Sequence, residues 1–114
     1  MKAWTILGCA ALLLAGCSQT PKLYYHGPFN KVMYSYFNGN DLSIGEQITV
    51  LEDVIARAMA KNQPVAPGIH AHLGMLYFET GETALGERHL NEEKALFPES
   101  AQYMDFLLNA HKDT

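Results

Sequence analysis

The feature that most constrains this 114-residue chain is the spacing of glycines and apolar residues between Pro67 and Pro98. Gly74 and Gly86 lie inside two segments whose apolar residues recur at helical spacing, and Gly81 lies between them. A glycine within a helix costs about 1 kcal/mol relative to alanine, so two such positions indicate two helices in close contact. Gly81 is typical of the left-handed residue that follows a helix. We therefore expect an antiparallel helix pair with a tight turn at Gly81.

Apolar periodicity predicts further helices on both sides of this pair. Segments 29–37 and 43–62 precede it, and Ser43 followed by Glu46 predicts a capping box at the start of the second. Glu99-Ser100 leads into a fifth helix after it, so the expected fold class is all-α with about five helices. The side chains expected on the buried faces are Phe29, Val32, Met33, Tyr36 and Phe37, then Ile44, Ile48, Leu51, Ile55 and Met59, then Ile69, Leu73, Leu76 and Tyr77, and finally Leu85, Leu90 and either Leu96 or Phe97.

Composition narrows the class of protein. Apolar residues make up 48% of the chain and charged residues 18%, which suits a single packed domain. The formal net charge is −4, and basic residues form no run, so we exclude a nucleic-acid partner. Both cysteines, Cys9 and Cys17, lie near the start, so the fold has to rely on helix packing and not on disulfides.

The first residues differ in character from the rest of the chain. The apolar run from Ala3 to Ala15 is shorter than the about 20 residues of a membrane-spanning helix and suits a signal peptide. It closes on Leu14-Ala15-Gly16-Cys17, which resembles the lipobox of bacterial lipoproteins. That resemblance implies cleavage before Cys17 and lipidation of this cysteine. The alternatives are a plain signal peptide that ends in cysteine and an N-terminal membrane anchor.

Lipidation at Cys17 would fix the location of the protein. Two or three acyl chains, at about 0.8 kcal/mol per buried methylene, give durable anchoring. Ser18 after the cysteine, by resemblance to enterobacterial sorting, favours the outer membrane, and we expect the periplasmic leaflet. Tyr24-Tyr25, before a Gly-Pro break, predicts an extended segment laid over the helices. The expected organisation is a signal peptide at 1–16, a lipidated tether at 17–28 and a helical domain at 29–110.

The helix pair resembles a tetratricopeptide repeat, a unit of about 34 residues that buries its apolar faces by stacking on neighbours. His70 stands where the repeat usually has a large apolar residue, and Glu93 where it has a small one. From Glu93 we expect this side of the helix to be open to solvent or to a partner. The preceding pair fits the repeat only loosely. The matching positions are Leu73, Gly74, Tyr77, Gly81, Gly86, Leu90 and Pro98.

A closer resemblance covers nearly all of the chain after residue 22. Pro-Gly-Ile-His-Ala-His-Leu-Gly at 67–74, Glu-Lys-Ala-Leu-Phe-Pro-Glu-Ser at 93–100 and Met-Asp-Phe-Leu-Leu at 104–108 are similar to a family of small bacterial lipoproteins, domain-of-unknown-function family 4810. The resemblance implies an outer-membrane lipoprotein with tetratricopeptide-like helices. It also implies an envelope partner related to the lipoproteins of the curli secretion channel. The family has no established catalytic residues, so none is transferred.

No residue pattern in the sequence indicates catalysis or metal binding. His70 and His72 are two residues apart, so on a helix they point to opposite sides and cannot share a metal ion. His89 with Glu92 and Glu93 is better explained as a solvated helix face than as a metal site. We expect no enzyme activity, no cofactor, no metal and no small-molecule substrate.

The surface we expect to bind a partner is the inner face of the first repeat helix, which carries Ala71, Met75, Phe78 and Glu79. Methionine and phenylalanine beside a carboxylate suit an amphipathic helix or an extended peptide. The alternative is that the C-terminal helix or the Tyr24-Tyr25 segment covers this face within the same chain.

These observations predict a lipid-anchored adaptor for protein–protein interaction in an envelope or secretion-related assembly. A different class of function is a structural subunit of a homo-oligomer or fixed envelope complex. A third is an accessory activator of a cell-wall enzyme.

Overall fold

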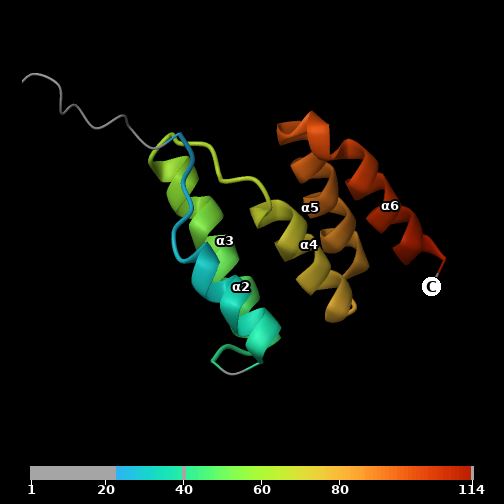
Figure 1. Ribbon diagram of the computed structural model, residues 1–114, viewed down its shortest axis with the longest axis horizontal. Helices are drawn as coiled ribbons and strands as arrows, with labels where there is room; N and C mark the ends of the chain where they lie inside the picture. The colour runs from blue at the N-terminus through green and yellow to red at the C-terminus, as the bar shows by residue number, and fades with distance from the viewer. Residues whose placement is uncertain (1–22, 40, 114) are drawn as a thin grey trace, which may run out of the picture.

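The computed structural model describes residues 23–39 and 41–113, and it confirms the predicted all-α fold (Figure 1). The predicted signal peptide, and Cys17 with it, lies outside these residues. Within them, no helix has the length and apolar character needed to cross a membrane. The helices are α2 (Phe29–Asn38), α3 (Ile44–Ala60), α4 (Ile69–Glu79), α5 (Thr83–Leu96) and α6 (Ala101–Lys112), with a 3-10 turn, η2 (Pro98–Ser100), before α6.

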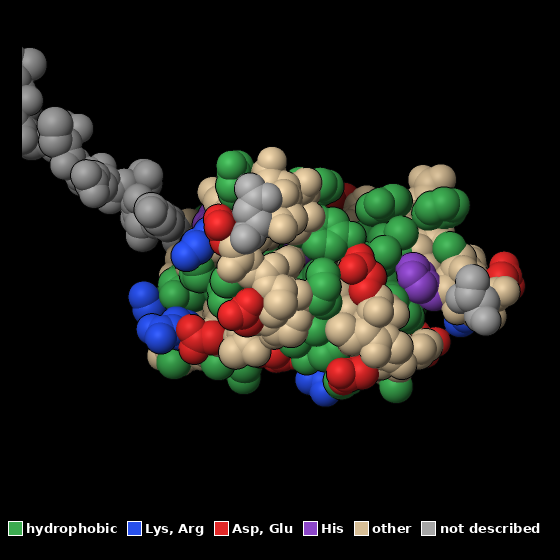
Figure 2. Space-filling view, turned by 90° about the horizontal axis from the view of Figure 1, so that it is seen from below, with side chains coloured by type: hydrophobic (Ala, Val, Ile, Leu, Met, Phe, Trp, Pro, Cys, Tyr) green, Lys and Arg blue, Asp and Glu red, His purple; other side chains and the backbone are tan. Residues whose placement is uncertain are grey.

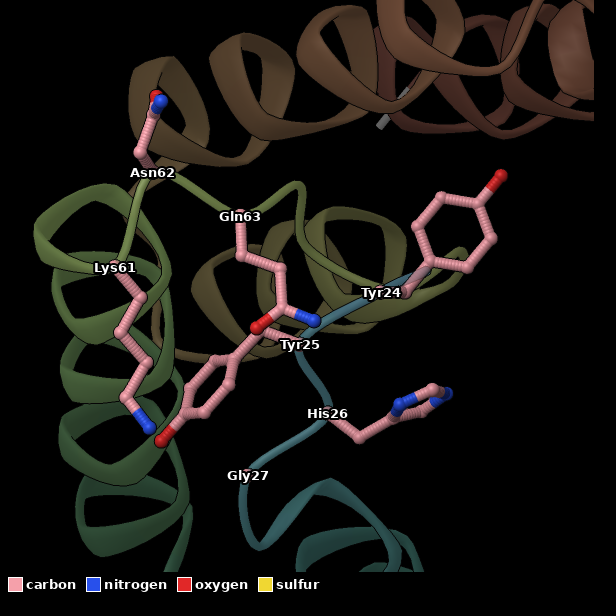
Figure 3. A pocket seen from close by; sticks show the side chains of 7 residues that line it. All are labelled: Tyr24, Tyr25, His26, Gly27, Lys61, Asn62 and Gln63. Atoms are coloured by element: carbon pink, nitrogen blue, oxygen red, sulfur yellow. The ribbon is translucent and has the colours of Figure 1, made fainter. Parts of the chain in front are cut away.

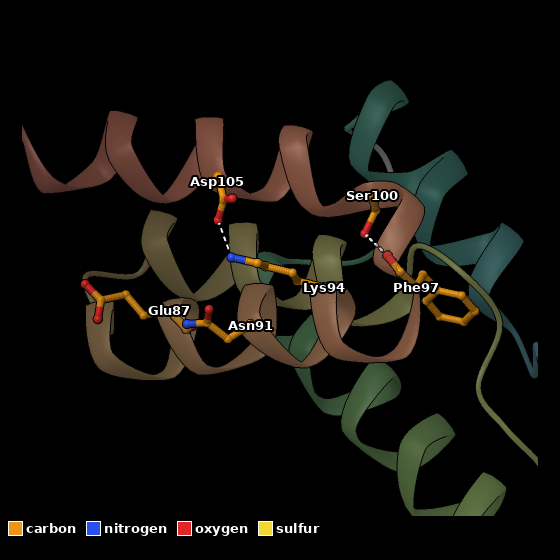
Figure 4. A network of polar contacts seen from close by, with 6 residues as sticks. All are labelled: Glu87, Asn91, Lys94, Phe97, Ser100 and Asp105. Atoms are coloured by element: carbon orange, nitrogen blue, oxygen red, sulfur yellow. Dashed lines mark hydrogen bonds and ion pairs between the residues drawn. The ribbon is translucent and has the colours of Figure 1, made fainter.

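Successive helices pack side by side along the molecule (Figure 1). The α2–α3 pair is followed by the α4–α5 pair, and α6 lies along the outer side of α5. Lys94 of α5 donates a hydrogen bond of 2.6 Å to Asp105 of α6, which joins the last two helices (Figure 4). The hydroxyl of Ser100 donates to the carbonyl of Phe97 at 2.7 Å and closes the turn between them.

Local sequence signals fix the helix ends. The predicted capping box is confirmed, because Ser43 accepts from the backbone N–H of Glu46 while the Glu46 side chain accepts from that of Ser43. These hydrogen bonds lower the pKa of the Glu46 carboxyl. Gly81 has a φ of 82°, so the predicted left-handed turn between α4 and α5 is also confirmed.

The predicted close contact between the two helices of the central pair is confirmed at both glycines. A Cβ atom at Gly74 would lie 2.9 Å from Leu90 Cδ2 and 3.0 Å from the carbonyl oxygen of Gly86. A Cβ atom at Gly86 would lie 2.9 Å from three ring atoms of Phe78. Any side chain beyond hydrogen would therefore push α4 and α5 apart.

The core lies on slightly different faces from those predicted. Phe37 and Met59 were expected to be buried, but their side chains are 74% and 76% exposed. The buried stripe of α3 is centred on Val54 and Ala58, so Met59 lies at its outer edge. At the end of α5, Phe97 is buried, whereas Leu96 is exposed. The fully buried side chains that fill the centre are Val32, Leu51, Val54, Ile69, Leu73, Leu76 and Leu90.

The segment before α2 was predicted to be extended over the helices, and it pairs with the connection between α3 and α4. Tyr25 donates its backbone N–H to the carbonyl of Pro64 at 2.7 Å and accepts from the N–H of Ala66 at 3.0 Å. The Tyr24 ring meets Phe97 edge to face. An open cavity of about 710 Å³ lies beside this segment, and Lys61 extends along it towards Tyr25 (Figure 3).

Candidate partner-binding surface and histidine cluster

Helix α4 lies near the centre of the structure and packs mainly against α5 and α3 (Figure 1). Individual side chains of α4 also reach α6 on one side and α2 on the other. Successive helical residues differ by about 100° in direction. Ala71 and Phe78 therefore share one side, and His72 and Glu79 share another. Met75 projects between the two sides. The four residues predicted to bind a partner thus span the surface from the α6 side to the α2 side.

The side of α4 that carries Ala71 and Phe78 is packed against α6. Both residues contact the small apolar cluster of Leu90, Met104 and Leu108. The Phe78 ring also stacks on His111 of α6, with ring centroids 3.9 Å apart. The C-terminal helix of the same chain therefore covers this part of the predicted surface.

The other side of α4 meets aromatic residues of α2. The Tyr36 hydroxyl donates a hydrogen bond of 2.5 Å to the Glu79 carboxylate, and this bond raises the pKa of the Tyr36 hydroxyl. The exposed Phe37 ring meets Tyr36 edge to face at 5.4 Å. We call Tyr36, Phe37, Met75 and Glu79 the α2–α4 face. In Figure 2, hydrophobic side chains gather between the α2–α3 pair and the helices that follow, with acidic side chains beside them.

His70 and His72 point to opposite sides of α4, as predicted. The His72 ring lies beside Tyr36, with centroids 4.7 Å apart, and beside Phe29 at 6.4 Å. Its Nε2 atom is buried and has no hydrogen-bond partner in the described part of the chain. Burial lowers the pKa of His72, so the neutral imidazole is the favoured form.

His70 faces α5 and forms a buried pair with His89. The two Nδ1 atoms are 3.0 Å apart, and the rings stack at 5.3 Å. Nε2 of His89 lies 3.4 Å from Oε1 of Glu52 on α3, and the same oxygen accepts a hydrogen bond of 2.7 Å from the Tyr77 hydroxyl. The interpretation of His89 as part of a solvated face is wrong, because its side chain is only 3% exposed.

Burial determines the charge states of this cluster. It lowers the pKa of both His70 and His89 by disfavouring the imidazolium form. The effect is opposed at His89 by the nearby Glu52 carboxylate. Burial and the hydrogen bond to Glu52 raise the pKa of Tyr77 to about 12. These shifts favour the neutral forms of both histidines and of the tyrosine.

The prediction that Glu93 faces solvent or a partner is also wrong. Its side chain is 3% exposed, and its carboxylate accepts hydrogen bonds from the backbone N–H groups of Gly68 at 2.7 Å and Ala71 at 3.2 Å. These groups lie at the start of α4, where backbone donors have no partner within the helix. Glu93 supplies the cap that Gly68, which has no side chain, cannot supply.

Sequence reasoning missed the residues that α2 and α3 contribute. Tyr36 does pack against the core and Glu52 is partly exposed, as predicted. What the sequence did not indicate is that each is hydrogen-bonded to a residue more than twenty positions away. The helical period of a sequence predicts the direction in which a side chain leaves its own helix. It does not predict which residues of a neighbouring helix that side chain will contact. Among the described residues, no group of three or more histidine, cysteine or acidic side chains is arranged to hold a metal ion.

One of three comparisons with known proteins identifies a family. Neither the comparison with curated proteins nor that with solved structures gave a match. The family model described as a domain of unknown function (DUF4810) matches residues 23–107, which contain α2 to α5 and most of α6. The chain therefore belongs to the DUF4810 family.

Proposed function

We propose that this protein is a helical adaptor that binds another polypeptide through the α2–α4 face. The observation that carries the proposal is the arrangement of this face across two helix pairs. Phe37 is 74% exposed beside Tyr36, and Tyr36 is hydrogen-bonded to Glu79 on α4. Large exposed apolar side chains beside a fixed polar group are typical of surfaces that bind other proteins.

The chemistry of the face favours one kind of occupant. Phe37 and the half-buried Met75 offer apolar contacts, and methionine adapts its shape to different partners. Glu79 offers a negative charge that is exposed and already oriented by Tyr36. An amphipathic helix or extended peptide with a basic residue beside its apolar side chains fits these contacts. The resemblance to tetratricopeptide repeats supports the same mode of binding.

The proposed location is the periplasmic leaflet of the outer membrane, with lipid on Cys17. It rests on the Leu14-Ala15-Gly16-Cys17 sequence and on Ser18. Tethering would raise the effective concentration of the adaptor near an envelope partner, so that weak contacts suffice. A lipoprotein related to the curli secretion channel is the candidate partner. Replacing Cys17 with serine should abolish fatty-acid labelling and release the protein from membranes, and retention on membranes without label would contradict anchoring at this residue.

Photo-crosslinking in intact cells tests the adaptor proposal. The crosslinking amino acid replaces Met75, a residue of the α2–α4 face. In a control variant it replaces the exposed Ala84 on α5. One dominant envelope protein should be captured from position 75 and not from position 84.

A matched pair of variants then locates the contact. Phe37→Ala should reduce the adduct at least tenfold, because a truncated anchor residue commonly costs about 2 kcal/mol of binding. Phe106→Ala, which removes another largely exposed phenylalanine, from α6, should leave the adduct unchanged. Adducts only between copies of this chain would favour the structural-subunit alternative. A rate change in a cell-wall enzyme on adding the protein, without stable adducts, would favour the activator alternative.

A further inference from the structure

A second cavity lies apart from the α2–α4 face. It has a volume of about 390 Å³ and is formed by α3, the connection to α4, the start of α4 and α5. Ile55, Met59 and Leu96 form its apolar walls. Met59 and Leu96 are 76% and 48% exposed, so the cavity opens to solvent between them. These dimensions suit a short aliphatic chain and not a whole peptide helix.

The histidine pair lines this cavity, and its polar contacts indicate which nitrogen atoms carry protons. Nε2 of His89 faces a carboxylate oxygen of Glu52 at 3.4 Å. A carboxylate can only accept, so this Nε2 carries the hydrogen. In a neutral imidazole the other nitrogen is then an acceptor. Nδ1 of His89 therefore accepts, and Nδ1 of His70 donates across the 3.0 Å contact.

The consequence is an unused acceptor within the cavity. Because Nδ1 of His70 carries the hydrogen, Nε2 of His70 has a free lone pair. No described residue donates to this atom. His70 is only 8% exposed, and what remains exposed borders the cavity that the residue lines. A ligand that satisfies this atom must bring an N–H or O–H donor.

The charges that line the cavity favour one class of hydrogen-bond donor as its ligand. The carboxylates of Glu52 and Glu92 line it together with one guanidinium, that of Arg88. With the histidines neutral, the charge of the lining is −1. The acceptor and the two carboxylates favour a cation with N–H donors, and the apolar walls favour an aliphatic chain behind it.

We propose that this cavity binds a primary alkylammonium group, with Nε2 of His70 accepting one of its N–H bonds and the carboxylates of Glu52 and Glu92 balancing its charge. The methylene chain lies between Ile55, Met59 and Leu96. The group comes from a lysine side chain of a partner protein or from a free alkylamine, and both present the same chemistry. This site is independent of the proposed adaptor surface, since the two share no residue.

Nuclear magnetic resonance of the full chain in detergent micelles, with ¹⁵N-labelled histidine, tests the proposal. The probe is n-pentylammonium. Three probes of similar size change the head group. Pentan-1-ol keeps a donor but lacks the charge, pentyltrimethylammonium keeps the charge but lacks N–H donors, and pentanoate reverses the charge and lacks donors. Pentylammonium should shift the ¹⁵N signal of His70 Nε2 saturably, and the three others should bind at least fivefold more weakly. Equal binding of pentyltrimethylammonium, tighter binding of pentanoate, or no shift with pentylammonium would overturn the proposal.

Two substitutions of exposed glutamates test whether pentylammonium binds in this cavity. Glu92→Gln removes an exposed lining carboxylate and should weaken pentylammonium binding about fivefold, the size of one partly exposed charge contact. Glu99→Gln removes the same charge outside the cavity and should leave binding unchanged. Equal effects of both variants would mean nonspecific attraction and contradict the site. Lysine with blocked amino and carboxyl groups distinguishes the two sources of the alkylammonium group. If it binds as tightly as pentylammonium, the ligand is a lysine side chain of a partner protein. If it binds tenfold more weakly, the ligand is a free alkylamine.

Discussion

Glu93 and Gly68 lie 25 residues apart in the sequence, yet the carboxylate of Glu93 accepts the backbone N–H of Gly68 at 2.7 Å. Gly68 precedes α4 with a φ of 95°, a conformation that glycine adopts without strain. The same carboxylate also accepts from Ala71. A side chain on α5 therefore caps α4, and a negative charge is held at the positive end of that helix.

Removing this cap should destabilise the protein. Glu93→Ala leaves two backbone donors without their charged acceptor in a buried site, and we expect a loss of about 2 kcal/mol in the free energy of unfolding. Glu93→Gln retains one acceptor oxygen and should lose about half as much. Urea unfolding followed by circular dichroism measures both. Glu92→Ala, at the exposed neighbouring position, should change stability by less than about 0.5 kcal/mol. Equal losses at positions 92 and 93 would contradict the capping role.

The contact at Gly74 predicts opposite effects for two glycine-to-alanine substitutions. Gly74→Ala would place a methyl group 3.0 Å from the backbone oxygen of Gly86, which cannot move aside without moving α5. We expect a loss of about 1–3 kcal/mol in spite of the better helix propensity of alanine. Gly45→Ala in α3 meets nothing within 4 Å and should gain up to about 1 kcal/mol. Thermal unfolding of both variants measures the difference, and a stabilised Gly74→Ala variant would show that α4 and α5 are not in close contact.

Much of the fold could be predicted because its signals are local. The capping box at Ser43, the turn at Gly81 and the approach at Gly74 each depend on residues within one helix or one hairpin, so spacing and propensity suffice. The exposure of Phe37 and Met59 could not be predicted in this way. Both fit the helical period but lie at the edge of the stripe, and the neighbouring helix decides where the burial ends.

The polar interior was harder to predict than the apolar core. Glu93 and His89 are residue types that usually face solvent, and their burial depends on partners brought by other elements. Gly68 was one indication of a buried polar contact, because a helix that begins without a capping side chain needs a hydrogen-bond acceptor from another element. His70 was a second indication, because a histidine at a core position of α4 needs a polar partner.

Alkaline titration should single out Tyr77. Its pKa is raised to about 12 by burial and by the hydrogen bond to Glu52, above the value of about 10 for an unfolded chain. A raised pKa stabilises the fold below pH 10, and that contribution is lost as the pH rises towards 12. Ultraviolet absorbance should show a late-ionising tyrosine that disappears in Tyr77→Phe. The control variant Tyr103→Phe, at an exposed position, should retain the late-ionising tyrosine. Its disappearance in that variant would contradict the assignment.

Mild acid should destabilise the protein through its buried histidines. Burial lowers the pKa values of His70, His72 and His89. Below about pH 6.5 the unfolded chain binds protons that the native state excludes, so stability falls as the pH falls. Each histidine contributes a slope of at most about 1.4 kcal/mol per pH unit. Urea unfolding at several pH values between 7 and 5 should therefore give decreasing free energies, and a flat profile would contradict the neutral assignment of the three side chains.

His72 allows this effect to be separated from the histidine pair. Its buried Nε2 atom has no partner among residues 23–39 and 41–113, and its ring lies beside those of Phe29 and Tyr36. His72→Phe places a ring of similar size there without the unsatisfied nitrogen, and we expect a gain of about 1 kcal/mol at neutral pH. Because the substitution also removes one of the three lowered pKa values, stability should fall less steeply between pH 7 and 5. A loss of stability in His72→Phe would mean that Nε2 accepts or donates a hydrogen bond in solution, and the aromatic surroundings of this residue would then serve to position a polar contact and not to bury a neutral ring.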